Sequence, residues 1–510
     1  MAGVIAAWAA PAHAAAVCDV PGTSWQRVTP AEAGMDAAKL QDAMDYGSAN
    51  LGFAVRVYRY GCLVAEDRLA PVNGNTQFES WSMAKSVTAL IFGRAMTLGL
   101  ISPDDPVGSL VPEADRAHGA ITIRNLLTQT SGLRWNGFRD YNIFTMPDRV
   151  RDALTLDPVK KPGTYFEYAQ SPIALLAEAV GRSAGEDVQT FGQQELLDPI
   201  GISKDSWFWR RDPAGHVQGF FGVNMRPDDF ARLGELMRRG GNWHGRNLLG
   251  RSFLSQAVAP SPTNGCYGWL IWLNAGAPCI GPTVQQRPVS DTREFPDLPA
   301  DMYHFSGLFG QLVTVFPSQG IVVARMGEDP GLAFAGGAGW EHGLYQRVLS
   351  AVTDQKITPP GPAPEAFSDQ TKDYGFQTAL REPDQYSKGV SQDPLPAAGP
   401  YRARASQLRL ARKRASKAGL VWIRIACPPR WPGSGPHECR GAARLSGARR
   451  PAGYRLQPGN SRVLRFRLTR ARLRSLVTHG SASLTVTAVN VDAAGGTPAS
   501  AAVAVSRPKA

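Results

Sequence analysis

Alternating hydrophobic and polar residues mark two distant parts of the chain as strands. Residues 52–60 (GFAVRVYRY) and 62–70 (CLVAEDRLA) predict two strands that turn at Gly61. Stretches of similar character predict further strands over 267–274, 310–317 and 320–327. Because the two sets are widely separated in the chain, we expect one sheet assembled from distant segments.

Helical spacing dominates the region between these strands. Residues from about Ser82 to Leu98 predict a helix that is buried nearly all round, with Gly99 suited to its C-terminal end. Residues 122–133 predict a short capped helix ending at Gly132, and 134–260 are expected to be mostly helices and loops. The sequence therefore predicts a sheet with a helical insertion.

The second half of the chain changes character twice. Residues 275–303 are expected to form a long Pro-rich loop, and 357–400 a Pro-rich linker. Beyond the linker, apolar and polar residues alternate in GLVWIRIACPP, SRVLRFRLTR and ASLTVTAVNV. This alternation predicts a small β-sandwich over 401–510.

The net charge also differs between the part of the chain before the predicted linker and the part after it. Residues 401–510 hold 22 Lys and Arg but only two acids, a net charge of +20. The whole chain of 510 residues carries +12, which leaves −8 for residues 1–400. Such asymmetry indicates two domains with different surfaces. We expect domains over 19–356 and 401–510.

The N-terminus and the cysteines favour export. Residues 1–16 are small and apolar, which predicts a secretory signal, truncated because no Lys or Arg precedes Arg27. A disordered Ala-rich terminus is the alternative. No later stretch is long and apolar enough to predict a membrane span. The six cysteines, in an exported protein, predict sequential disulfides: Cys18 with Cys62, Cys266 with Cys279, and Cys427 with Cys439.

The segment SWSMAKS, residues 80–86, carries candidate chemistry. A serine hydroxyl needs a base within hydrogen-bond reach, and on a helix the neighbours lie three or four positions apart. Ser82 has Lys85 at that spacing, whereas Ser80 and Ser86 have no base in register. Burial and the positive helix N-terminus both disfavour the ammonium form of a lysine and so make it a base. The same S-x-x-K spacing recurs at Ser506, where a proline excludes a helix.

Four segments, in order, resemble the serine β-lactamase-like hydrolases. The resemblance is narrowest to the branch of class C β-lactamases, family VIII carboxylesterases and 6-aminohexanoate-dimer hydrolases. It covers roughly residues 25–350 and rests on SWSMAKSVTALIFGRAMTLGLISPDDPV, ITIRNLLTQTSGL, PGTYFEYAQSPIALLAEAVG and FSGLFGQLVTVFPSQGIVVA. It implies an α/β (α+β) fold in which helices flank a sheet like that of β-lactamases and penicillin-binding proteins, with a helical subdomain and here a C-terminal all-β sandwich.

The resemblance also implies roles for individual residues. Ser82 would attack an ester or amide carbonyl to form an acyl-enzyme, and Lys85 would help to deprotonate it. Tyr168 matches the family tyrosine that passes a proton to the leaving group, and a close ammonium would favour its phenolate. Tyr165, three residues earlier, is the competitor. An N–H near Leu308 would complete the oxyanion hole, and Gly307 permits close approach of the backbone.

Departures from the family pattern point to the substrate. Gln170 stands where the family has Asn and would still hydrogen-bond substrate. The family's K-T-G lysine is replaced in Phe305-Ser306-Gly307, and a phenylalanine cannot hold a substrate carboxylate. His304 should point to the opposite strand face. Gln311 matches a family glutamine, for which we expect a structural role.

These features predict an exported serine hydrolase, secreted or in the periplasm or cell envelope, that acts on a small-molecule ester or linear amide. The alternatives are β-lactamase or D,D-peptidase-type activity, or a silent protein that binds the cell envelope. Residues 401–510 are expected to meet an anionic cell-envelope surface rather than nucleic acid, since they lack a reader motif. We expect no cofactor and no metal, because His437-Glu438-Cys439 lacks partner ligands.

Overall fold

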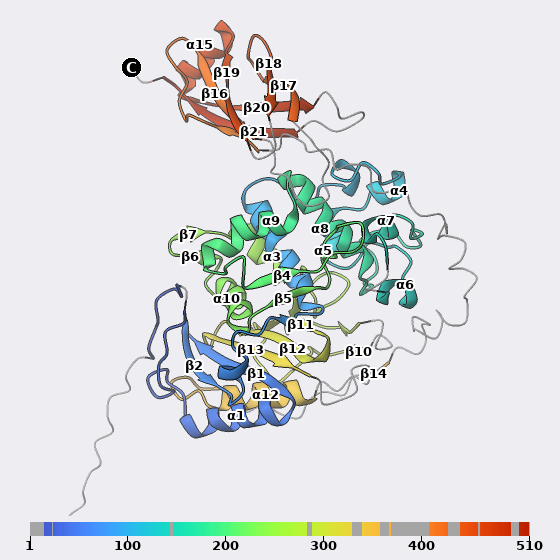
Figure 1. The fold of residues 1–510 in the computed structure, drawn as a ribbon, viewed down its shortest axis with the longest axis vertical. Coiled ribbons are helices and arrows are strands. Elements are labelled where there is room, and N and C mark those ends of the chain that lie inside the picture. The colour runs from blue at the N-terminus through green and yellow to red at the C-terminus, as the bar shows by residue number, and fades with distance from the viewer. Residues whose placement is uncertain are drawn as a thin grey trace, which may run out of the picture.

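The computed structural model contains one large antiparallel sheet at its centre (Figure 1). The structure describes residues 15–22, 24–142, 146–282, 288–328, 339–357, 367–368, 407–426, 439–456, 460–490 and 499–508. The sheet has six strands in the order β2-β1-β13-β12-β11-β8. The N-terminal pair is thus joined directly to the last strands of the set, which confirms a sheet built from distant segments.

The strand bounds match the predictions over 52–60, 310–317 and 320–327 closely. The strands are β1 (Gly52–Arg59), β2 (Cys62–Glu66), β8 (Trp272–Leu273), β11 (Tyr303–Gly307), β12 (Gln311–Phe316) and β13 (Ile321–Gly327). The expected strand over 267–274 is wrong in extent. Leu270 has a left-handed φ of 55°, which interrupts extended backbone, so only two residues pair.

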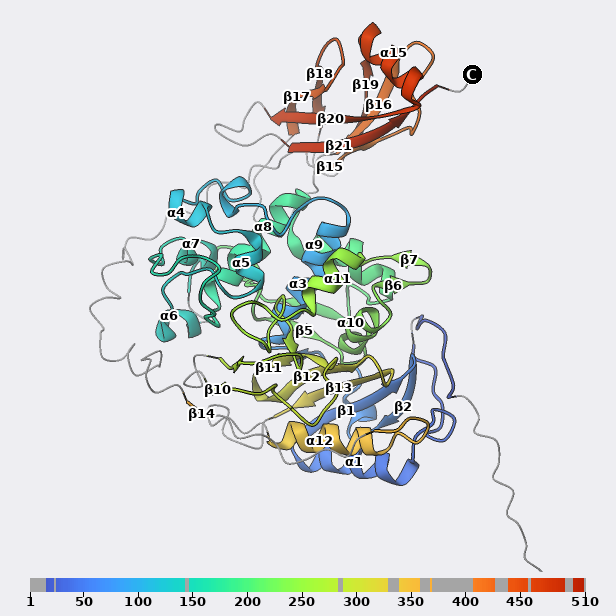
Figure 2. The ribbon, with the colours of Figure 1, turned by 180° about the vertical axis from the view of Figure 1, so that it is seen from behind.

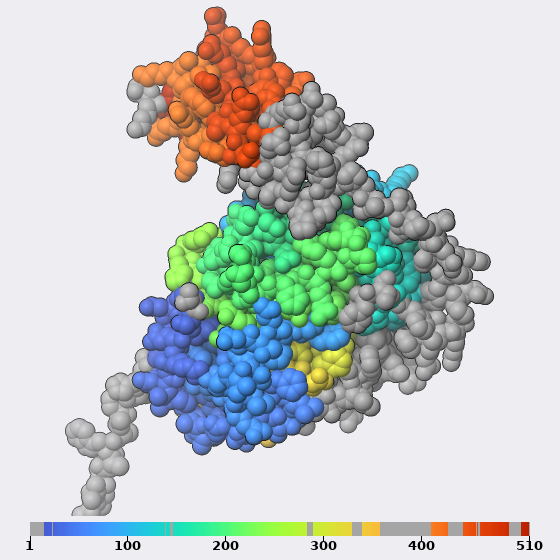
Figure 3. Space-filling view, viewed as in Figure 1, coloured from blue at the N-terminus to red at the C-terminus, as the bar shows by residue number. Residues whose placement is uncertain are grey.

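Helices cover both faces of this sheet (Figure 2). The helices α1 (Ala37–Ala49) and α12 (Gly339–Ser350) pack on one face, where Leu40 and Leu344 share a core with Val55 and Val323. The neighbouring strand residues point the other way, into a larger core that holds the helical insertion. The sheet is therefore buried on both sides, and little of its yellow part is visible in the space-filling view (Figure 3).

Helix α3 (Met83–Thr97) is the central helix of the larger core. Its residues from Met83 to Ala95 are all buried, as the predicted all-round apolar character requires. Gly99, just beyond its C-terminal end, has a φ of +71° that a glycine adopts without strain. The helix runs as predicted and begins immediately after Ser82, its N-cap residue.

The insertion is mostly helical, as expected. Its helices are α4 (Arg116–Gly119), α5 (Ile123–Leu127), α6 (Gly137–Tyr141), α7 (Arg149–Ala153), α8 (Ser171–Ala184), α9 (Val188–Gly192), α10 (Pro227–Arg238) and α11 (Arg251–Ala257). Thr122 caps α5 by accepting a hydrogen bond from Asn125 N. The helix ends at Leu127, earlier than predicted, because Gln129 turns to a φ of 56°.

Short elements complete this part of the chain. The short helices are α2 (Ala70–Asn73), Val107–Ser109, Gln193–Leu197, Asp198–Ile200 and Leu308–Gly310. The short strands are β3 (Phe78–Glu79), β4 (Trp207–Trp209), β5 (Val223–Met225), β6 (Asn242–Trp243), β7 (Arg246–Asn247), β9 (Cys279–Ile280), β10 (Pro288–Ser290) and β14 (Phe367–Ser368). The loop expected over 275–303 thus contains two short strands.

Two of the three expected disulfides lie within the described residues. Cys18 bonds to Cys62, which ties the N-terminal segment to β2, and Cys266 bonds to Cys279. Cys427 of the third expected pair, most of the predicted signal and most of the predicted linker lie outside the described residues. Among the described helices none is long and apolar enough to cross a membrane.

The C-terminal region has its own hydrophobic core between two sheets. Their orders are β15-β16-β19 and β18-β17-β20-β21. The strands are β15 (Gln407–Leu410), β16 (Leu420–Ala426), β17 (Cys439–Leu445), β18 (Ala452–Leu456), β19 (Ser461–Arg467), β20 (Ser481–Asn490) and β21 (Ala499–Ser506). The sequence did not predict helix α15 (Arg470–His479), which Thr469 caps through Arg472 N.

Candidate active site

Ser82 lies where an extended segment meets the first turn of α3. Lys85, one turn along, places its Nζ 2.9 Å from Ser82 Oγ. The spacing seen in the sequence therefore brings the two side chains into direct contact. A neutral amine at this distance could equally accept the hydroxyl proton.

The environment of Lys85 makes a neutral amine accessible near neutral pH. The lysine is 1 % exposed. Burial lowers its pKa from 10.5 to about 7, while the negative charge of Asp140 opposes part of that shift. The amine also faces the ring of Tyr168, with 4.5 Å between Nζ and the ring centroid. Lys85 thus has both the position and the proton affinity of a general base.

Residues at the start of α8 complete this contact. Gln170 precedes the helix, and its Oε1 accepts a hydrogen bond from Lys85 Nζ at 2.5 Å. The amide predicted to hydrogen-bond substrate is therefore already in contact with the candidate base. Tyr168, two residues earlier, is 5 % exposed and packs against Tyr267 and Trp272.

The protonation of Tyr168 differs from the expected phenolate. Burial raises the pKa of its phenol well above the usual 10, and a hydrogen bond with Ser82 opposes only part of that shift. The negative charge of Asp140 raises the pKa of this phenol further. This environment therefore favours the neutral phenol of Tyr168, which can donate a proton.

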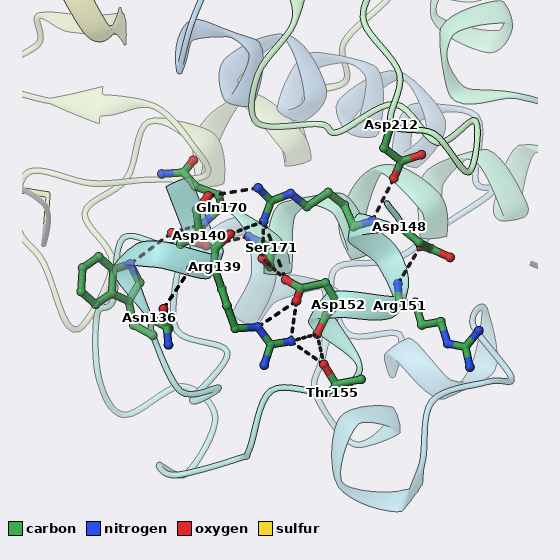
Figure 4. A network of polar contacts seen from close by, with 12 residues as sticks. Asn136, Arg139, Asp140, Asp148, Arg151, Asp152, Thr155, Gln170, Ser171 and Asp212 are labelled. Atoms are coloured by element: carbon green, nitrogen blue, oxygen red, sulfur yellow. Dashed lines mark hydrogen bonds and ion pairs between the residues drawn. The ribbon is translucent and has the colours of Figure 1, made fainter. Parts of the chain in front are cut away.

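A buried carboxylate, that of Asp140, lies at the start of α8 beside Gln170 and Ser171 (Figure 4). Asp140 accepts hydrogen bonds from Gln170 N at 2.8 Å and Ser171 N at 3.0 Å. Behind it Arg149 donates to Ser171 Oγ at 3.2 Å. Burial raises the pKa of Asp140, although the Ser171 N–H and the Arg149 charge favour its carboxylate. The network fixes the first turn of α8 and, with it, Gln170.

The end of β11 approaches the same helix start from the other side. A Cβ added to Gly307 would lie 2.1 Å from the carbonyl oxygen of Ser80 and 3.2 Å from Met83 N. This close backbone approach requires glycine, as expected. Ser306 and Leu308 flank it and are both half-buried. The backbone at Gly307 therefore packs directly against the backbone at the start of α3.

The neighbouring positions of β11 point alternately to the two cores. Phe305 lies in the larger core with α3. His304 faces the opposite side, as predicted, where its Nε2 is 2.9 Å from Glu294 Oε2 and its ring contacts Phe295. The position matching the family lysine is thus apolar and 1 % exposed.

Gln311 has a structural contact in the strand pair. Its Nε2 donates to the carbonyl oxygen of Gly327 at 2.5 Å, and its Oε1 accepts from Gly327 N at 3.2 Å. These bonds join β12 to the end of β13. The side chain therefore supports the turn that follows Gly307.

The sequence did not predict Asp140 as part of this site. Nothing in its local pattern separates it from an ordinary helix acid. Tyr165, the competitor of Tyr168, faces Lys160 at 4.1 Å and is not among the ring neighbours of Lys85.

Within the described residues no cluster of three or more His, Cys, Asp or Glu side chains could hold a metal ion.

The arrangement agrees with one protein family. The family model described as Beta-lactamase matches residues 37–344, more than half of the chain. A β-lactamase of Escherichia coli is 26% identical over 188 residues, which are 32% of this chain and 48% of that protein. A methylbutanoyltransferase of Penicillium citrinum is 24% identical over 202 residues, 34% of this chain and 44% of its own. The chain spans less than half the length of these curated relatives.

Solved structures include similar chains at low identity. A class C β-lactamase in complex with cefoxitin is 18% identical with a TM-score of 0.46, covering 61% of this chain and 99% of its own. A Bacillus anthracis protein named as a 6-aminohexanoate-dimer hydrolase is 16% identical with a TM-score of 0.49, covering 66% and 90%.

The pKa of Lys85 gives a testable pH dependence. Labelling of Ser82 by a fluorophosphonate should increase as pH rises through about 7, because only the neutral amine accepts a proton. Asp140→Asn removes the charge that raises the Lys85 pKa, so the midpoint should move to lower pH. The same substitution replaces the carboxylate that accepts a hydrogen bond from Gln170 N. The labelling rate at the high-pH plateau should therefore fall by about tenfold.

A matched control is Asp157→Asn, since Asp157 is exposed and pairs with Arg134 at the surface. It should leave both midpoint and plateau unchanged. An unmoved or raised midpoint in Asp140→Asn would show that the carboxylate does not act on Lys85.

Proposed function

This chain belongs to the Beta-lactamase family of serine hydrolases, and on that premise we propose that it is an exported enzyme cleaving esters or linear amides through an acyl-enzyme on Ser82. The observation that carries the proposal is the 2.9 Å contact between Ser82 Oγ and the amine of the buried Lys85. A merely structural lysine rarely tolerates such burial. The arrangement therefore favours catalysis over a silent binding protein.

Acylation begins at the Ser82 hydroxyl. Neutral Lys85 takes its proton while Oγ bonds to the substrate carbonyl carbon, and the carbonyl oxygen becomes an oxyanion. The Ser82 N–H and an N–H near Leu308 would stabilise that charge. The oxyanion then collapses, the bond to the alcohol or amine breaks, and Tyr168 gives the leaving group its proton. Tyr168 regains a proton from Lys85.

Water completes the cycle. Its oxygen attacks the acyl carbonyl while its proton passes through Tyr168 to Lys85, and collapse releases the acid. Lys85 returns the proton to Ser82 Oγ. A neutral Tyr168 suits this relay, because it can donate one proton as it accepts another.

The apolar position at Phe305 supports esters or linear amides over β-lactams or D,D-peptides. A carboxylate-bearing substrate gains charge-assisted hydrogen bonds from a cation at this position. Phe305 offers none and is buried against α3. Gln170, in contact with Lys85, retains an amide N–H₂ group whose Nε2 lies 3.3 Å from Tyr141 Oη.

The two described disulfides support export, because cystines persist outside the reducing cytosol. In the C-terminal sandwich the outward-facing residues of β16 and β19 include Trp422, Arg424, Arg465 and Arg467. The guanidinium of Arg412 lies 4.6 Å from the Trp422 ring centroid. Charge complementarity suits this face to an anionic lipid surface of the cell envelope.

Removing the nucleophile tests the central proposal. Ser82→Ala should abolish hydrolysis of p-nitrophenyl butyrate and labelling by a fluorophosphonate, because no other serine of the segment contacts a base. Turnover is measured as release of p-nitrophenol.

Ser86→Ala is the matched control. Ser86 lies on the same helix, and its hydroxyl donates to the Leu270 carbonyl oxygen at 2.7 Å, so the variant should keep its labelling. Undiminished hydrolysis in a folded Ser82→Ala protein would end the proposal.

A substrate panel tests the inference from Phe305. The kcat/KM for p-nitrophenyl butyrate should exceed that for nitrocefin by at least about tenfold, the loss expected when a carboxylate lacks a charged partner. The methyl ester of nitrocefin, which lacks that carboxylate, is the matched control and should be hydrolysed no more slowly than nitrocefin. Faster turnover of free nitrocefin than of both esters would favour β-lactamase activity instead.

The sandwich face is tested with the full chain and lipid vesicles. Arg465→Gln with Arg467→Gln should weaken binding to phosphatidylglycerol vesicles by about tenfold at moderate salt. Arg444→Gln with Arg474→Gln removes equal charge outside this face and should weaken binding less. Equal loss in both double variants, or tighter binding to duplex DNA than to vesicles, would contradict the assignment.

A further inference from the structure

Two aromatic residues beside the candidate nucleophile have left-handed backbones. Trp81, directly before Ser82, has a φ of 48°, and Phe309, two residues after Gly307, has a φ of 61°. A bulky residue pays a steric penalty in this region, so such conformations persist only where the surroundings enforce them. Both residues lie on the segments that would supply the oxyanion donors.

The two rings contact one another. Their centroids are 5.0 Å apart in an edge-to-face arrangement, and Phe221 lies 5.5 Å from Trp81 on another side. Phe221 is buried, whereas Trp81 and Phe309 are half-buried. The left-handed backbones at Trp81 and Phe309 therefore keep both rings partly exposed instead of fully buried.

Polar groups enforce the turn at Trp81. Its N–H donates to Glu79 Oε1 at 3.2 Å, and the other carboxylate oxygen of Glu79 accepts from Asn224 Nδ2 at 3.0 Å. The Gly222 N–H also donates to Glu79 Oε1, at 3.0 Å. The Glu79 carboxylate thus ties Trp81 to Gly222, which follows Phe221, and to Asn224 on β5.

The turn at Phe309 is enforced separately. Its carbonyl oxygen accepts from Gln311 Nε2 at 3.1 Å and from Arg325 Nη1 at 3.4 Å. Arg325 is fully buried and also donates to the Gly310 carbonyl oxygen at 2.6 Å. Both rings are therefore placed in advance of any ligand, which limits the entropy lost on binding.

A different group of rings surrounds the candidate proton donor. Tyr168 packs against Tyr267 and Trp272, whereas Trp81 contacts Phe221 and Phe309. The leaving group must meet Tyr168 to receive its proton. The rings of Trp81 and Phe309 are thus left for the part of the substrate that stays on Ser82.

Resting on the function proposed above, we propose that Trp81, Phe309 and Phe221 form an aromatic subsite for the acyl group. Half-exposed rings in edge-to-face contact offer planar and apolar surface to a ligand ring. The neighbouring Phe305 adds no charge. The substrate class that fits is an ester or amide of an arylalkanoic acid, uncharged beyond the reacting carbonyl.

The test varies the acyl group while the leaving group stays constant. The kcat/KM for p-nitrophenyl 3-phenylpropionate, divided by that for p-nitrophenyl acetate, measures the acyl preference. The ratio should be above one in the unchanged protein and fall by about three- to tenfold in Trp81→Asn and in Phe309→Asn. Asparagine tolerates a left-handed φ, so these variants remove the rings without adding backbone strain.

Phe208→Leu is the control, since Phe208 is an exposed aromatic residue on β4 outside the site. It should keep the ratio. Phenethylboronic and methylboronic acids, which bond to a reactive serine, give a second reading as the ratio of their inhibition constants. The melting temperature of each variant reports folding.

The outcomes separate the subsite from the function. A ratio near one in the unchanged protein, or one unaffected by both variants, overturns the subsite while Ser82-dependent hydrolysis stands. The subsite is also overturned, while the hydrolysis stands, if the two variants change the preference among acetate esters with different leaving groups instead of the acyl preference. If neither esters nor boronates react with Ser82, both the function and the subsite are overturned.

Discussion

The contact between a serine hydroxyl and a buried amine governs the rest of this structure. Lys85 must be buried deeply enough for its pKa to fall to about 7. Its amine must also have hydrogen-bond partners, because a buried polar group without them destabilises the fold. A helix buried on all sides meets the first demand. Gln170 and Ser82 meet the second by accepting from the amine. The all-round apolar character of α3 is therefore a chemical requirement as much as a packing one.

The polar groups around the site act mainly by fixing backbone. Asp140 anchors the start of α8, Glu79 anchors the turn at Trp81, and Gln311 with Arg325 anchors the turn at Phe309. Each lies outside the serine–lysine contact and sets the position of a group that faces it. Catalytic geometry must hold within fractions of an ångström, and such anchors supply that precision without entering the reaction.

The sequence predicted the parts whose signals are local. Strand alternation located β1, β12 and β13, and spacing on one helix singled out Ser82 and Lys85. Tyr168 and Gly307 required the ordered family segments, because their neighbours in space are far away in the chain. Asp140 and the ring contact of Trp81 with Phe309 could not be foreseen, since each depends on two segments that are far apart in the chain. The predicted bounds of α5 and β8 are wrong because Gln129 and Leu270 have left-handed backbones. The sequence does not predict this conformation at residues other than glycine.

The order of strands has a consequence for how the chain reaches its final form. β1 pairs with β13, so Gly52 lies opposite Gly327, and nearly the whole intervening chain must exist before that edge is covered. Until then the edge of β1 that pairs with β13 has no partner, and Cys18–Cys62 is the earlier of the two described disulfides along the chain. Contacts of such long sequence separation slow folding and expose strand edges to other chains.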